Sequence, residues 1–184
     1  GGRWSRPEQA QQDVRFIADL IDQLKSQYNL DEARIYANGL SNGGGMTFLL
    51  ASELSERIAA IGGVGGAYAL PWSDYQPKRP VPAMIFHGTA DSIVPYHGKA
   101  WGNSGLALPD IPQWVQTLAV RNGCSTKALR LPDQGSVSGL HYLGGSNHAD
   151  VVFYTVTGGG HTWPGGKPMA EFIVGKTTTD VDAT

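Results

Sequence analysis

The chain has 184 residues, of which 41% are hydrophobic and 16% are charged, and its formal net charge is -2. This length and composition predict one globular domain, residues 1–184, with enough apolar residues for a core. The small net charge and the lack of a lysine or arginine cluster argue against a nucleic-acid partner. No run reaches the roughly 20 apolar residues of a membrane span, and no signal peptide is visible.

The first regular segment follows Pro7. Its apolar residues recur with the spacing of one helix face, namely Val14, Ile17, Leu20, Ile21, Leu24 and Tyr28. This period predicts an amphipathic helix of about five turns. Its charged residues are expected to face solvent.

A strand candidate, residues 34–38, leads into Gly39-Leu-Ser41-Asn-Gly43, and a helix candidate follows at 46–54. Strand, G-x-S-x-G turn and helix in this order predict a nucleophile elbow with Ser41 at its apex. In such a turn the two glycines are expected because a Cβ at either position would clash. The serine hydroxyl would then lie at the carboxyl edge of a sheet.

The rest of the chain alternates strand and helix signals. Apolar runs at 58–64, 81–88 and 150–156 predict strands, the first of them buried on both faces, and 111–122 predicts a helix. Residues 69–82 are rich in proline and predict a loop, and 128–131 with 140–142 predict a weak hairpin. This order predicts an α/β fold with a mostly parallel sheet flanked by helices.

An acid and a base follow two of the later strands. Asp91 lies just after the strand at 81–88, and His161 follows the strand at 150–156. The chain order serine, acid, histidine is that of α/β-hydrolases, and the carboxyl ends of parallel strands share one edge. Ser41, His161 and Asp91 are therefore predicted to be nucleophile, general base and the acid that orients the base.

The oxyanion formed during acyl transfer needs donors. One donor is expected to be the backbone N–H of Asn42, the residue after the nucleophile. The second normally comes from an earlier strand-to-helix loop, and no such loop precedes the elbow in this sequence. In a measured example, loss of one donor costs roughly 10² to 10³ in rate.

The other reactive residues have simpler interpretations. His87, inside a strand, is expected to be a hydrogen-bonded structural residue, whereas His97, His141 and His148 are expected to be exposed. A metal site from His87, Asp91 and His97 matches no reliable ligand spacing. The only cysteine, Cys124, is expected to be buried and inert, and no cofactor or metal is expected.

Motifs along nearly the whole chain resemble one family. They are Val14-Arg-Phe-Ile17, Gly-Leu-Ser41-Asn-Gly-Gly, His87-Gly-Thr-Ala-Asp91 with Val94-Pro-Tyr96, Arg121-Asn-Gly-Cys124, and Gly-Gly-Gly-His161-Thr-Trp-Pro-Gly165. The chain resembles the polyhydroxybutyrate depolymerase-like and feruloyl esterase group of secreted α/β-hydrolases. The resemblance implies the same roles for Ser41, Asp91 and His161, and an extracellular location.

The chain also departs from this family. Members continue upstream through further strands and a loop that supplies the second oxyanion donor, and downstream into a final helix. The resemblance thus implies a chain truncated at both ends, poorly soluble or weakly active alone, with an elbow strand that lacks one neighbour. The cysteine that would pair with Cys124 in the family is replaced near Gly145.

The sequence favours a serine ester hydrolase acting on feruloyl, acetyl or short hydroxyalkanoate esters, including polyesters and plant-polysaccharide esters. Trp163, two residues after His161, is a substrate-binding candidate. Two alternatives stay open: a serine peptidase of the same fold, and a noncatalytic module that binds a ligand through Trp72, Trp101, Trp114 and Trp163. Neither a nucleic acid nor a membrane is expected as a partner, and the oligomeric state is left open.

Overall fold

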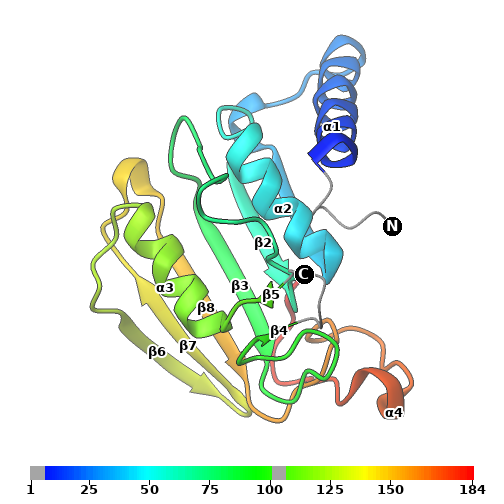
Figure 1. Cartoon of the computed structure of the whole chain (residues 1–184), viewed down its shortest axis with the longest axis vertical. Helices are drawn as coiled ribbons and strands as arrows, with labels where there is room; N and C mark the ends of the chain where they lie inside the picture. Colours follow the sequence, from blue (N-terminus) through cyan, green and yellow to red (C-terminus); the bar gives the residue numbers. More distant parts are fainter. Residues whose placement is uncertain (1–6, 101–106) are drawn as a thin grey trace.

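The structure, a computed structural model, describes residues 7–100 and 107–184. Its main feature in this part of the chain is a six-stranded sheet of order β1-β2-β3-β8-β7-β6 (Figure 1). The strands in that order are β1 (Tyr36–Leu40), β2 (Ala60–Val64), β3 (Ala83–Gly88), β8 (Val151–Val156), β7 (Val137–Tyr142) and β6 (Leu129–Gln134). The first four run parallel, whereas β7 and β6 are antiparallel. The mostly parallel sheet of the predicted α/β fold is confirmed.

Helices cover one face of this sheet. The α-helices are α1 (Pro7–Gln27), α2 (Asn42–Glu53), α3 (Ile111–Arg121) and the short α4 (Glu171–Val174). Two 3-10 turns, Glu32–Arg34 and Ser146–His148, and a small ladder of β4 (Lys99–Ala100) with β5 (Ala107–Leu108) complete the described elements. In Figure 1, α2 and α3 lie over the same side of the strands, and α1 stands beyond α2. No helix in the described ranges is long and apolar enough to cross a membrane.

The core lies between these helices and the sheet. Its buried side chains come from α2, α3 and the helix-facing positions of the strands, and include Phe48, Ile61, Ile85, Trp114, Val115, Leu118 and Phe153. The predicted loop at 69–82 joins this core, because the ring of Tyr75 stacks on that of Phe48 with centroids 4.4 Å apart. Trp72 and Trp114 also pack against each other. These two tryptophans therefore anchor the structure, which weakens the alternative of a ligand-binding module; Trp101 lies outside the described residues.

Helix α1 buries a narrower stripe than its periodicity predicts. Ala10, Val14 and Ile21 are buried, whereas the side chains of Leu20 and Tyr28 are 37% and 62% exposed. The prediction of one continuous apolar face is wrong at these two positions. Helix α1 has contacts with α2, and a single neighbouring helix covers only a narrow strip of a helix surface.

Within the described residues, the opposite face of the sheet is covered only near the carboxyl ends of the strands. There Phe86 and Val156 are buried beneath the C-terminal segment that contains Thr162, Pro164 and Thr178. Toward the amino ends, Tyr36 and Met84 are exposed on the same face. On β2, Ile61 and Gly63 are buried, whereas Ala60 and Gly62 are only half-buried. The predicted burial of this strand on both faces is thus wrong for its first residues.

Strand β1 is an edge strand in the described part of the chain, since it pairs with β2 alone. The elbow strand was expected to lack one neighbour, and it does so here. The predicted hairpin is confirmed and is longer than its sequence signal, because β6 and β7 pair with each other and β7 also pairs with β8. The carboxyl ends of β1, β2, β3 and β8 share one edge of the sheet, where the predicted site residues lie.

Candidate active site

Ser41 lies in a strained turn between β1 and α2. Its backbone angles are φ 60° and ψ -120°, a region that residues with a side chain rarely adopt. The turn is held by backbone hydrogen bonds: the Ser41 N–H donates to the Val64 carbonyl over 2.9 Å, and the Ala67 N–H donates to the Ser41 carbonyl over 3.0 Å. The serine is therefore tied to the end of β2. This backbone is that of the predicted nucleophile elbow.

The close packing of the elbow depends on different glycines from those that the motif indicates. A Cβ on Gly39 would lie 2.4 Å from the backbone carbon of Gly43, and a Cβ on Gly44 would lie 2.7 Å from the Cα of Gly66. At Gly43 a Cβ would meet no atom within 4 Å. The prediction that both glycines of G-x-S-x-G exclude a side chain is therefore correct at Gly39 and wrong at Gly43. Gly44 takes the second role, where α2 crosses the loop after β2.

Asp91 follows β3 in a tight turn and is 4% exposed. Its Oδ1 accepts hydrogen bonds from the backbone N–H groups of Ile93, at 2.9 Å, and Val94, at 2.8 Å. These two donors fix the orientation of the carboxylate, so that its second oxygen, Oδ2, points away from them. Hydrogen bonds from backbone N–H groups to a carboxylate oxygen are charge-assisted and hold the group firmly in place.

His161 follows β8 and pairs with this second oxygen. Its Nδ1 is 2.7 Å from Asp91 Oδ2, and the side chain is only 6% exposed. With Asp91 as a carboxylate, Nδ1 carries the proton and donates it, so that Nε2 of the neutral ring is left with a lone pair. An imidazole held in this tautomer is suited to accept a proton from a hydroxyl.

Gly65 brings the serine turn and the acid–base pair to the same place. Gly65 follows Val64, which binds the Ser41 N–H, and has φ +50°. A Cβ on Gly65 would lie 3.1 Å from His161 Nδ1 and 3.2 Å from Asp91 Oδ2. The sequence showed Gly65 only as the end of a strand, and nothing local indicated that it contacts the pair.

The structure joins two of the three predicted catalytic side chains directly. Among the described residues, the Ser41 hydroxyl makes no hydrogen bond to His161, whereas His161 and Asp91 are hydrogen-bonded. Catalytic hydrogen bonds are often long without substrate and tighten when it binds. Asn42, the predicted oxyanion donor, is the first residue of α2, so its N–H belongs to the positive end of that helix.

Trp163 lies on a different surface from the triad residues. It lines a groove of about 200 Å³ with Tyr36, Met84 and Phe86 on the sheet face opposite α2. None of Ser41, Asp91 and His161 lines this groove. The predicted contact between Trp163 and substrate stays a prediction.

The other histidines are mostly as expected. His97 is exposed and pairs with Asp110 at 2.8 Å, so it does not face Asp91, and His148 is exposed. His141 is an exception: it is half-buried and lies 3.1 Å from Asp150. The prediction that His141 is exposed is wrong, because antiparallel pairing places it on β7 beside β8.

Cys124 is free and buried, and burial raises the pKa of its thiol. A raised pKa means less thiolate at neutral pH, which is consistent with the predicted inert cysteine. Within residues 7–100 and 107–184, no group of three or more histidine, cysteine or acidic side chains is placed to hold a metal ion.

No protein-family model matches the chain. Similar proteins are NocK of Nocardia uniformis subsp. tsuyamanensis, assigned as an esterase, and feruloyl esterase B of Piromyces equi. Both are 29% identical, over 90% and 88% of this chain and 53% and 31% of their own lengths. Probable feruloyl esterase C of Aspergillus clavatus is 27% identical over 82% of the chain and 50% of its own length. The chain thus spans about half the length of these relatives, or less.

A solved structure supports the fold. Acetyl xylan esterase from Aspergillus awamori aligns over 81% of the chain and 62% of its own, with a TM-score of 0.53 and 17% identity. The chain thus has the fold of this esterase and is similar in sequence to the esterases named above. The sharp turn at Ser41 follows β1, and Asp91 and His161 follow β3 and β8, which is the strand order of the α/β-hydrolase fold.

Proposed function

We propose that this α/β-hydrolase is a serine carboxylic ester hydrolase that works through an acyl-enzyme. The observation that carries the proposal is the buried pair of His161 Nδ1 and Asp91 Oδ2, 2.7 Å apart, packed against Gly65 beside the Ser41 turn. Relatives named as feruloyl esterases support the ester-hydrolase class. Feruloyl, acetyl or short hydroxyalkanoate esters, including polyesters and plant-polysaccharide esters, are the proposed substrates.

The residues have distinct tasks in the proposed reaction. His161 Nε2 takes the Ser41 proton while Oγ attacks the ester carbonyl, and the same nitrogen then protonates the alcohol that leaves. Asp91 keeps the proton on Nδ1 and stabilises the imidazolium. The Asn42 N–H, at the start of α2, is the proposed donor to the oxyanion. Water, activated by His161, then releases the acid from Ser41.

The proposed setting is extracellular and rests on the family resemblance alone. A polyhydroxybutyrate depolymerase-like activity is part of the same proposal, because the Ser41 and His161 motifs resemble that group. Release of hydroxyalkanoate from polymer particles, compared with release of ferulate or acetate from plant polysaccharide, would assign the substrate class.

The first test is covalent labelling with a fluorophosphonate followed by peptide mapping. We expect one label, on Ser41, that is lost in Ser41→Ala and slowed by at least about 10²-fold in His161→Ala. His148→Ala, at an exposed histidine, is the matched control and should label like the wild type. Paired nitrophenyl ester and peptide anilide substrates separate the two hydrolase classes, and turnover of the anilide alone would contradict an ester hydrolase. Failure of the folded wild-type chain to label would contradict the proposed nucleophile.

A further inference from the structure

A second histidine lies beside the acid of the proposed triad. His87 is on β3, one residue before its end, and is 1% exposed. Its Nε2 is 2.8 Å from the Val94 carbonyl oxygen and 3.6 Å from Asp91 Oδ2. The first distance is a hydrogen bond and the second is too long for one. Because a carbonyl only accepts, the proton is on Nε2, and Nδ1 carries a lone pair.

This hydrogen bond closes a ring of contacts around the acid. His87 holds the carbonyl of Val94, and the N–H of the same residue donates to Asp91 Oδ1. The turn that supplies both N–H donors to Asp91 is thus fixed to β3 by the His87 ring. Without the hydrogen bond from His87, the carboxylate could rotate, and its Oδ2 would no longer be directed at His161 Nδ1.

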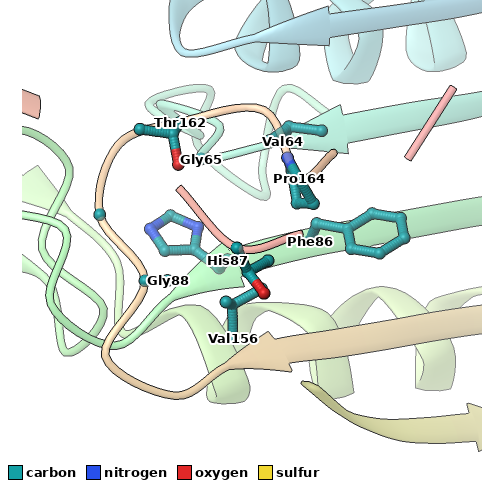
Figure 2. A pocket seen from close by; sticks show the side chains of 11 residues that line it. Val64, Gly65, Phe86, His87, Gly88, Val156, Thr162 and Pro164 are labelled. Carbon is teal, nitrogen blue, oxygen red and sulfur yellow. The ribbon is translucent and has the colours of Figure 1, made fainter. Parts of the chain in front are cut away.

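His87 also lines a small cavity. The cavity measures about 10 Å³ and lies between the ends of β2 and β3 and the loop that carries Thr162 and Pro164. Figure 2 shows the His87 ring among the residues that line this cavity, with the loop that carries Thr162 and Pro164 passing around it. His87 Nδ1 has no hydrogen-bond partner among the described protein atoms. A volume near 10 Å³ is the lower limit for one water molecule.

We propose that His87 is a positioning residue, which holds the Ile93–Val94 turn and thereby aims Asp91 at His161. The ring acts as a neutral donor from Nε2, and a single water molecule in the cavity donates to Nδ1 and favours the same tautomer. The charged and titratable groups around His87 are Asp91, His161 and the phenol of Tyr96. Burial lowers the pKa of His87, which agrees with a neutral ring at neutral pH. The catalytic consequence rests on the proposed function.

Two variants distinguish the hydrogen bond that His87 donates from the space that its ring fills. His87→Gln places an amide N–H near the position of Nε2, whereas His87→Met has a similar length and no donor. We expect His87→Met to lower kcat on a nitrophenyl ester at least about tenfold, because loss of a side chain that orients a functional group commonly costs that much. KM should stay within about twofold, since no substrate contact changes. His87→Gln should recover most of the loss.

Recovery of kcat in His87→Gln, with KM unchanged in both variants, distinguishes positioning of the acid by the Nε2–H donor from a simple loss of packing. His141→Met is the matched control, because His141 also pairs with an aspartate but lies away from the site. Equal losses of kcat in both His87 variants, or a folded His87→Met with wild-type kinetics, would overturn the proposal.

Nuclear magnetic resonance of the wild-type chain tests the positioning without activity or folding of a variant. Histidine 15N–1H correlation should show His87 with its proton on Nε2 throughout the neutral range, and a downfield proton for His161 Nδ1–H. A charged His87, or a proton on Nδ1, would overturn the proposal. If instead these signals are as expected and no ester is hydrolysed, the proposed function fails and the positioning role stands.

Discussion

The two halves of the proposed site are built in different ways. Asp91 and His161 follow β3 and β8, which pair with each other along six residues in the middle of the sheet. Ser41 follows β1, an edge strand in the described part of the chain, and its turn depends on close backbone approaches at Gly39 and Gly44. The acid–base half is thus held by buried side-chain hydrogen bonds, whereas the nucleophile half is held by backbone hydrogen bonds and has no room for a Cβ at Gly39 and Gly44. Substitutions in the acid–base half should mainly lower the reaction rate, whereas substitutions at the elbow should mainly lower stability.

The largest expected effect is on the rate, at the acid. Asp91→Asn keeps the shape of the side chain but removes the charge that holds His161 in its base tautomer. In a known triad the equivalent change lowers kcat about 10⁴-fold with little change in structure. Kinetics on a nitrophenyl ester, with a thermal melt of the same sample, should show a similar loss and a melting temperature near that of the wild type. A loss below tenfold would show that the acid–base half is not used as described.

The next effect is on stability, at the elbow. Gly39→Ala would place a Cβ 2.4 Å from a backbone atom of Gly43, so we expect a loss of about 3 kcal/mol in unfolding free energy or more. Gly43→Ala is the matched control, since its Cβ meets open space and alanine in a helix should add about 0.5–1 kcal/mol. Urea unfolding measures both. Equal effects at the two positions would contradict the steric account of the turn.

A smaller effect is expected where the two halves meet. Gly65→Ala would press on His161 and Asp91, and it also carries the cost of a positive φ. Gly158→Ala has the same backbone cost, with φ +71° and no atom within 4 Å of its Cβ. Both variants should lose about 1 kcal/mol of stability, but only Gly65→Ala should lower the rate of Ser41 labelling, by about tenfold. Equal labelling rates in the two variants would show that the close approach of Gly65 does not affect the pair of His161 and Asp91.

The smallest expected effect is a dependence of stability on pH. Burial lowers the pKa of His87 below its ordinary 6.5. Below pH 6.5 the unfolded chain binds a proton at His87 that the folded chain does not bind. The contribution of His87 to the free energy of unfolding is therefore full above this pH and declines as the pH falls toward the folded pKa. Urea midpoints at pH 7.5 and 5.5 should differ less in His87→Met than in the wild type. An unchanged difference would show that His87 is not the buried neutral group.

Much of this arrangement is visible in the sequence. The elbow, the order of Ser41, Asp91 and His161, the hairpin and the helix at α3 follow from local motifs and periodicity. The contact of Gly65 with the acid–base pair, the role of Gly44 and the bond from His87 to Val94 do not, because each joins residues through the packing of separate elements. The exposure of Leu20 on α1, and of Tyr28 just after its end, was missed for a similar reason, since periodicity reveals neither where a helix ends nor how much of it a neighbour covers.

The central claim is that Ser41, His161 and Asp91 act as one unit. The most direct measurement is the rate of fluorophosphonate reaction at Ser41 in the wild type, His161→Ala, Asp91→Asn and the double variant. If the residues act together, the double variant should react about as slowly as the slower single variant. Asp91 acts through His161, so its loss has no further effect on the rate once His161 is removed. Losses that multiply in the double variant, or a wild-type rate in either single variant, would contradict the account.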